Sequence, residues 1–248
     1  MNLTFTTDRG NIVPPPDFGN RLLASLPEDD LLHLESLCEQ VHVDVGDVLY
    51  EPGQAIQYIY FPSDSLISLL AVAEGRMTLE VGSVGREGMI GSSVALGHEL
   101  AQVRAVVQRA GHASRIHAAD FCAEFGRMES LQRLLYRYTD TLLAQAIQIA
   151  VCSRFHVLEA RLARSLLITR DRLQSEKFHL THEFLAHALG VRRVGVTKAA
   201  SALQNQKLIT YSRGNIEILD SAGLEAVSCR CYEMVKDTGS IGMANVFL

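Results

Sequence analysis

The chain has 248 residues, of which 48% are hydrophobic, and a formal net charge of −5 at pH 7. This length favours two domains, and the acidic balance argues against general affinity for nucleic acid. The N-terminus lacks the basic and apolar regions of a signal peptide, and the longest apolar stretch (66–73) is too short to span a bilayer. The sequence therefore predicts a soluble cytoplasmic protein.

The chain begins with a polar, proline-rich segment, residues 1–20, which we expect to be a loose arm. Residues 21–40 are predicted to be helical, because Pro27 can start a helix and apolar residues follow it at helical spacing.

From residue 41 the pattern changes to short β-rich runs separated by turn residues. The predicted strands are 41–45, 48–50, 56–61, 66–72, 78–84 and 103–108. His112 and His117 fall in a further strand-like run and are expected on the surface. Many short strands at regular spacing predict a sandwich or barrel, and we favour an antiparallel β-roll (a jelly roll) over residues 21–128, able to hold one small ligand.

Residues 129–155 carry an a/d pattern, with spacings that alternate between four and three over three heptads. The positions are Leu131, Leu135, Tyr138, Leu142, Gln145, Ile149 and Cys152. A single helix could bury this stripe on its own domain, but so narrow a stripe favours pairing with a second copy. The sequence therefore predicts a long central dimerisation helix, in which Gln145 is the polar position that fixes the register.

Residues 182–203 predict a helix-turn-helix whose turn lies at Gly190, because glycine adopts a positive φ without steric cost. The inward-facing residues are expected to be Leu185, Ala186, Leu189, Val191, Val196, Ala199 and Ala200. The second helix begins with Arg192 and Arg193, and Lys198 follows. In this motif the start of the second helix lies on base edges in the major groove. An ordinary helical hairpin with a solvated basic face is the alternative.

Two β-rich runs, 208–211 and 216–219, follow the helix-turn-helix and are separated by turn residues. A hairpin at this place predicts a winged helix, with Arg213 at the tip, where a cation would meet a phosphate. We expect residues 156–236 to form this DNA-binding domain and residues 237–248 to be a flexible tail.

The distribution of charge supports the DNA-binding interpretation. Residues 1–155 hold 11 Lys and Arg against 19 Asp and Glu, residues 156–213 hold 10 against 4, and residues 214–248 hold 2 against 5. The basic block coincides with the predicted helix-turn-helix, as expected of a surface that binds phosphates.

The cysteines show no metal or redox spacing. They are Cys38, Cys122, Cys152, Cys229 and Cys231. Three are isolated and the last two are separated by one residue, so we interpret all five as reduced, small buried hydrophobic residues. The sequence predicts no metal site.

The order of β-roll, long helix and winged helix resembles the Crp/Fnr family of bacterial transcription regulators. Residues 180–219 carry the resemblance, together with the phrases VGDVLYEPG and VGREGMIG, and it covers the chain from about residue 21. It implies an α+β fold with a cyclic-nucleotide-binding-like β-roll. It also implies a homodimer that binds a palindromic site on double-stranded DNA, with RNA polymerase as a further partner.

The family's recognition helix opens with Arg-Glu and carries a second basic residue five positions after that Arg. Here Arg193 and Lys198 occupy the basic positions, and Val194 stands where the family has Glu. The resemblance thus implies base reading by Arg193, Val194 and Lys198, with Arg193 on guanine and Val194 on a thymine methyl. The expected phosphate contacts are Thr181, His182, Arg192, Thr197 and Arg213.

The sensory half departs from the family's effector sites. Cyclic-nucleotide-binding members carry Gly-Glu-Leu and then Arg-Ser or Arg-Thr, whereas this chain has Gly-Ser-Ser from residue 91 and Glu99-Leu100, and Arg104 is the alternative cation. No cysteine precedes Cys38 to hold an iron–sulfur cluster, and between residues 41 and 97 His42 is the only Cys or His that could ligate heme. We therefore expect neither cyclic AMP nor heme nor an iron–sulfur cluster, and the effector stays unidentified.

Two other classes of function are alternatives. A ligand-binding module that acts on a partner protein is the main one, and the charge distribution argues against it. An enzyme is disfavoured because the sequence holds no paired acid and base, nucleophile motif or phosphate loop. The leading hypothesis is a dimeric, sequence-specific DNA-binding transcription regulator, with the β-roll as the candidate site for an effector that gates it.

Overall fold

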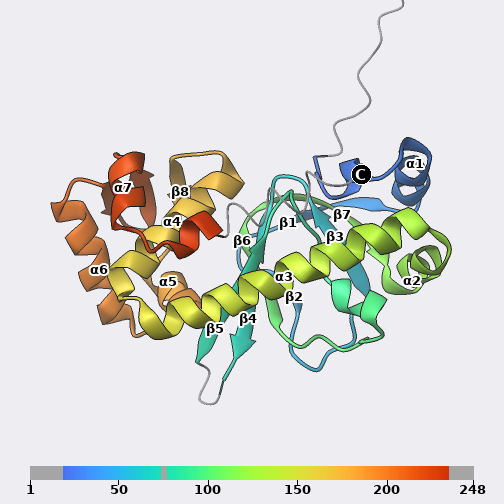
Figure 1. Ribbon diagram of the computed structural model, residues 1–248, viewed down its shortest axis with the longest axis horizontal. Coiled ribbons are helices and arrows are strands. Elements are labelled where there is room, and N and C mark those ends of the chain that lie inside the picture. Colours follow the sequence, from blue (N-terminus) through green and yellow to red (C-terminus); the bar gives the residue numbers. More distant parts are fainter. Residues whose placement is uncertain (1–18, 74–76, 235–248) are drawn as a thin grey trace, which may run out of the picture.

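The computed structural model describes residues 19–73 and 77–234, so the predicted tail and nearly all of the predicted arm lie outside it. The described chain has the predicted α+β architecture: a β-roll and a C-terminal winged helix lie at the two ends of the longest axis, and the long helix α3 (Glu129–Phe155) runs along the roll toward the winged helix (Figure 1). No helix in the described part of the chain is long and apolar enough to cross a membrane.

Two antiparallel sheets form the roll. Their strands are β1 (Glu39–Val43), β2 (Val48–Tyr50), β3 (Tyr58–Pro62), β4 (Leu66–Val72), β5 (Thr78–Val84), β6 (Arg104–Arg109) and β7 (Gly111–His117). One sheet has the order β1-β7-β3 and the other β2-β6-β4-β5. The predicted bounds of β2, β4 and β5 are confirmed, and the strand-like run at His112 is the central strand of the first sheet.

The helices that cover the roll differ from the prediction. The expected helix 21–40 is divided into a 3₁₀ turn, η1 (Leu23–Ser25), and α1 (Glu28–Ser36), because Pro27 has extended backbone and Glu39 already begins β1. The sequence did not predict α2 (Ala118–Arg127). Its Phe121 is fully buried, with its ring centroid 6.2 Å from that of Phe61.

One face of α3 packs against the roll. The Tyr138 hydroxyl donates to the Met89 carbonyl at 2.9 Å and accepts from the Met89 N–H at 3.0 Å. A Cβ at Gly88 would lie 2.5 Å from that hydroxyl oxygen, so this close approach requires glycine. Tyr138 thereby fixes the long helix, about 40 Å over its 27 residues, on the roll of its own chain.

This packing corrects the predicted dimer seam. Leu131, Leu135 and Tyr138 are buried in the core of the roll, and Cys152 is buried against Cys229 near the C-terminal domain. The remaining predicted positions, Leu142, Gln145 and Ile149, are half-buried. The heptad pattern predicted the helix but marks its inward side, because a helix packed on its own domain also needs an apolar stripe.

The opposite side of α3 carries a separate, solvent-exposed apolar stripe, in which the Tyr136 ring contacts Phe125 of α2 edge-on. It consists of Tyr136, Leu143, Ile147, Val151 and Phe155, which are 41–74% exposed. These residues, which we call the outer stripe, lie seven, four, four and four positions apart and therefore share one face of the helix.

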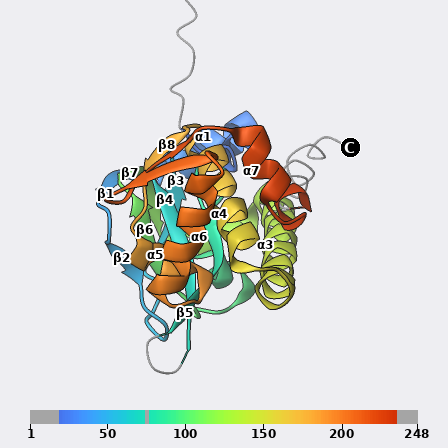
Figure 2. The same cartoon turned by 90° about the vertical axis from the view of Figure 1, so that its left-hand side faces the viewer.

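The C-terminal domain has a core of its own beneath the helix-turn-helix. Its elements are α4 (Leu158–Leu173), β8 (Lys177–His179), α5 (His182–Leu189), α6 (Arg193–Asn205), β9 (Ile209–Ser212), β10 (Asn215–Ile218) and α7 (Ser221–Val227). Leu162, Leu166 and Leu167 of α4 are buried there. The wing has a third strand that the sequence did not predict, β8, which pairs with β10. Viewed from this end, α5 and α6 lie in front of the roll (Figure 2).

Candidate nucleic-acid interface

The helix-turn-helix is built as the sequence predicts. Gly190 ends α5 with φ +64°, and the Val191 N–H donates to the Ala186 carbonyl at 2.9 Å across the turn. The buried contacts between the two helices come from Leu185, Ala186, Leu189, Val196, Ala199 and Ala200. At the other end of α5, the Thr181 hydroxyl accepts a hydrogen bond from the Phe184 N–H at 3.1 Å and caps the helix. Thr181 is exposed, so its O–H proton stays available to an anion.

Helix α6 presents its first two turns to solvent. The exposed side chains are Arg192, Arg193, Val194, Thr197 and Lys198. The first turn of α6 contains no acidic residue, so the arginine charges and the positive end of the helix dipole act together on an approaching phosphate. The structure thus brings the predicted base-reading residues together on one solvent-facing surface.

His182 is held inside this surface and does not reach outward. Its ring stacks on Tyr211 at 4.1 Å between centroids, and its Nδ1 lies 3.1 Å from the Thr197 hydroxyl. That hydroxyl donates to the Arg193 carbonyl, so Nδ1 carries the proton and donates to it. Nε2 is buried and has no hydrogen-bond partner among the described residues. Burial and the Arg193 guanidinium lower the pKa of His182, which keeps the ring neutral at pH 7.

The predicted phosphate contact from His182 is therefore corrected, because neither ring nitrogen can donate to an anion in this arrangement. The residue supports Thr197 and the first turns of α6. Tyr211 provides the stacking partner for His182. Sequence reasoning missed it because the contact joins β9 to the start of α5, two segments far apart in the sequence.

The wing ends in a two-residue turn at Arg213 and Gly214. Both have positive φ, +50° and +88°, as a type I′ hairpin requires. Arg213 is exposed at the tip, as predicted, while the Gly214 carbonyl accepts from the Leu180 N–H at 2.7 Å. The hairpin is therefore anchored next to the start of α5, and its free end carries a cation.

The C-terminal domain is docked on the roll through β5 and the turn that follows it. The Thr78 hydroxyl donates to the His187 carbonyl at 3.1 Å, near the end of α5. Arg172 of α4 donates to Glu87 at 2.9 Å and also to the Ser83 hydroxyl. These junction residues are far apart in sequence, so no local pattern predicts that they meet.

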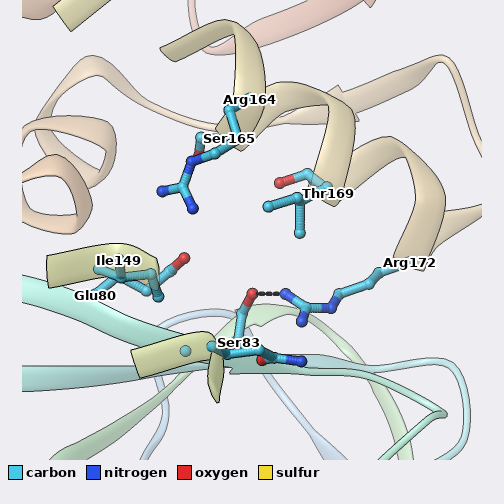
Figure 3. Close-up of a pocket in the computed structure, with 10 residues that line it drawn as sticks. Glu80, Ser83, Ile149, Arg164, Ser165, Thr169 and Arg172 are labelled. Carbon is cyan, nitrogen blue, oxygen red and sulfur yellow. Dashed lines mark hydrogen bonds between the residues drawn. The ribbon is translucent and has the colours of Figure 1, made fainter. Parts of the chain in front are cut away.

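A small cavity lies at this junction between β5, α3 and α4 (Figure 3). Arg164 and Arg172 point into it from α4, opposite Glu80 and Ser83 of β5. Its volume of about 20 Å³ matches about one water molecule. Burial raises the pKa of Glu80. The hydrogen bond from Ser68 and the charges of Arg164 and Arg172 act in the opposite direction, because they favour the charged carboxylate.

The interior of the roll is filled by apolar side chains, among them Ile59, Ile67 and Val107, each at most 1% exposed. Residues 92–96, where the resemblance implies the phosphate-binding phrase of cyclic-nucleotide-binding members, form the 3₁₀ helix η3 (Ser92–Leu96). The alternative cation, Arg104, is paired with Glu51 at 2.8 Å. Its charge is therefore already matched by a carboxylate.

Comparison with known families identifies the C-terminal domain. Residues 160–227 match the Crp-like helix-turn-helix domain, a range that runs from α4 through the wing to α7. No curated protein sequence is significantly similar to the chain.

Solved structures with the same fold include FixK2 from Bradyrhizobium japonicum, with 14% identity, a TM-score of 0.68, and coverage of 77% of this chain and 98% of that one. A Crp/Fnr-family transcriptional regulator from Thermus thermophilus has 24% identity, a TM-score of 0.64, and coverage of 77% and 98%. The c-di-GMP-responsive global regulator CLP from Xanthomonas campestris has 13% identity, a TM-score of 0.65, and coverage of 77% and 99%.

Fold and site together define a winged-helix protein of the DNA-binding type, with a β-roll and a long helix ahead of the basic surface. Residues 160–227 match the Crp-like helix-turn-helix domain, and over 77% of its length the chain shares the fold of a solved Crp/Fnr-family transcriptional regulator.

Proposed function

We propose that the protein is a dimeric, sequence-specific DNA-binding transcription regulator. The observation that carries the proposal is the exposed basic start of α6 within a Crp-like helix-turn-helix domain, on the part of the chain with a net positive charge. Double-stranded DNA is the partner that matches a helix of this kind. As a regulator of this type, the protein would act in the bacterial cytoplasm, with RNA polymerase as a further partner and without catalytic activity.

The residues divide into two roles. Arg193, Val194 and Lys198 read bases: a guanidinium pairs with two acceptors of guanine, and an apolar side chain fits the thymine methyl. Arg192, Thr181, Thr197 and Arg213 contact phosphates and set the position of α6 in the groove. Support comes from their exposure on neighbouring parts of one surface, at the start of α5, the start of α6 and the wing tip.

Dimerisation uses the outer stripe of α3 in this proposal. A two-fold contact places the same patch of both subunits face to face, and a helix with five exposed apolar residues offers such a patch. The site on DNA would then be palindromic, with its half-sites about one helical turn apart.

The roll acts as the sensor domain (21–128), α3 as the dimer helix (129–155) and residues 156–236 as the DNA-binding domain. A signal from the roll would reach α6 through the Thr78–His187 and Arg172–Glu87 contacts, which join the two parts. We propose that the effector is neither cyclic AMP nor heme nor an iron–sulfur cluster. The apolar interior and the paired Arg104 support this for a cyclic phosphate.

Selection of binding sites from random duplex DNA tests the central proposal. We expect enrichment of an inverted repeat with half-sites centred about 10 bp apart. Failure to enrich any sequence at low salt would contradict the proposal and favour a protein partner.

The dimer is tested separately by Ile147→Asp, with Ile147→Val as the matched control. Because Ile147 is 56% exposed, the aspartate is tolerated in a monomer, but it places two like charges in the proposed interface. We expect Ile147→Asp to weaken the dimer by more than about 100-fold and Ile147→Val to leave it unchanged, measured by analytical ultracentrifugation. An unchanged dimer in Ile147→Asp would place the interface elsewhere.

A further inference from the structure

Four metal-binding side chains meet where α3 ends. Cys152 and His156 lie one helical turn apart at the end of α3, and Cys229 and Cys231 follow α7. Their ligand atoms all lie within 4.8 Å of one another. The three cysteines are buried and reduced, with 0–6% of their surface exposed.

The separations between these atoms suit a single tetrahedral ion. The Cys152 and Cys229 sulfurs are 3.5 Å apart, and the Cys231 sulfur lies 3.4 Å from His156 Nδ1. Zinc–sulfur bonds of about 2.3 Å and zinc–nitrogen bonds of about 2.0 Å place tetrahedral ligand atoms roughly 3.8 Å (S to S) and 3.5 Å (S to N) apart. Small side-chain adjustments therefore bring the four ligand atoms to the corners of such a tetrahedron.

The surroundings of the cluster suit a charged metal–thiolate centre. Gln148 Nε2 lies 2.8 Å from the Cys231 sulfur and donates to it, as a partner that orients a metal ligand does. Arg161 and Arg164, 9% and 8% exposed, interact electrostatically with the Cys152 and Cys229 thiols. Arg164 Nε has no hydrogen-bond partner among the described residues. Three thiolates and one neutral imidazole around Zn²⁺ carry a net charge of −1, which these buried cations would balance.

We propose that Cys152, His156, Cys229 and Cys231 form a structural zinc site. With four protein ligands the coordination is complete, so the ion has no open position for substrate or water. The site links the end of α3 to the segment after α7, and so holds the DNA-binding domain against the dimer helix at a second point besides the α3–α4 connection. This role replaces the sequence-based interpretation of these three cysteines as packing residues only. Cys122, by contrast, is exposed.

Metal content of the full chain tests the proposal. The protein is purified anaerobically with a reductant and without chelators, and zinc is measured by inductively coupled plasma mass spectrometry together with the native mass. We expect one zinc per chain, and we expect the metal-free protein to take up cobalt(II) with the visible bands of a tetrahedral thiolate complex. A reduced protein that binds neither ion overturns the proposal. So does a purified protein that holds iron with sulfide, or a Cys152–Cys229 disulfide that persists under reductant.

Variants assign the metal to this cluster. Cys229→Ser should weaken zinc affinity by more than about 100-fold, because loss of a ligand costs more than loss of an outer partner. Cys122→Ser, the matched control outside the cluster, should bind as the wild type does. Where circular dichroism shows that Cys229→Ser has lost its fold, His156→Asn serves in its place, with half-buried His156 replaced by a side chain that can also hydrogen-bond. Equal binding by wild type and a folded ligand variant overturns the assignment. These measurements use no DNA, so their outcome is independent of the proposed DNA-binding function.

Discussion

A substitution at the wing-tip residue Arg213 is expected to change DNA affinity without changing the stability of the fold. Arg213 has φ +50°, a backbone conformation that costs a non-glycine residue about 1 kcal/mol. Arg213→Gly removes that strain but adds chain entropy to the unfolded state, a cost of about 0.5–1 kcal/mol. The two effects nearly cancel, so we expect the free energy of unfolding to stay within about 0.5 kcal/mol of the wild type.

DNA binding should respond differently. If Arg213 contacts one phosphate per subunit, Arg213→Gly removes two contacts per dimer, at about 1 kcal/mol each, and weakens affinity roughly 30-fold. The slope of log K against log salt should become shallower by about 1.8, equally on specific and nonspecific DNA. Fluorescence anisotropy across a salt series measures both quantities, and Arg213→Lys, which keeps the charge, is the control.

An unchanged salt slope in Arg213→Gly would refute the placement of the wing tip on the DNA backbone. A loss confined to one sequence would also contradict it, because that result assigns Arg213 to base reading. Thermal unfolding of the same sample shows that the variant is folded.

Arg193→Ala should cost about 1–3 kcal/mol per half-site on the selected sequence and relax discrimination at one base pair, in competition binding with single-base variants; an equal loss on every sequence would make Arg193 a phosphate contact. Tyr138→Phe should destabilise the fold by about 1–3 kcal/mol in urea unfolding, since the Met89 N–H and carbonyl lose their partner in a buried place; no change would mean that water replaces the hydroxyl. Glu35 of α1 has two buried carboxylate oxygens without a partner among the described residues, and burial raises its pKa to about 7 from 4.5. Because the pKa is higher in the folded state, Glu35 contributes to the stability of the folded protein below pH 4.5, and this contribution is lost as the pH rises to about 7. Glu35→Gln should therefore flatten the fall in melting temperature between these values and stabilise the protein by about 1 kcal/mol at pH 8, after allowance for partial exposure; a parallel fall in both proteins would contradict this.

The sequence predicted best those elements whose boundaries carry local signals. Turn residues on both sides set the bounds of β2, β4 and β5, and Gly190 located the turn between α5 and α6. Helix α2 carries no such signal, because His117 precedes it without a side-chain cap and its apolar residues cover less than three turns. Local sequence pattern therefore predicts helices and strands more reliably where turn or capping residues mark their ends.

The partner of each surface could not be predicted in the same way. The heptad of α3 looks the same whether Leu131 and Leu135 meet a second subunit or the roll, and periodicity records that a face is buried but not by what. His182 has the chemistry of a phosphate ligand, but it stacks on Tyr211 across the fold. The cluster of Cys152, His156, Cys229 and Cys231 joins the end of α3 to the segment after α7, so spacing along the chain does not reveal it.

The Thr78 hydroxyl caps the carboxyl end of α5 from a strand more than a hundred positions earlier in the chain. The tilt of the helix-turn-helix is consequently a property of the whole protein and cannot be transplanted with the C-terminal domain. A chimera that joins residues 156–234 to a foreign sensor would keep every proposed base-reading side chain but present these side chains at another angle. Substitutions in β5 would, for the same reason, change which operators are bound without any alteration of the residues that touch DNA.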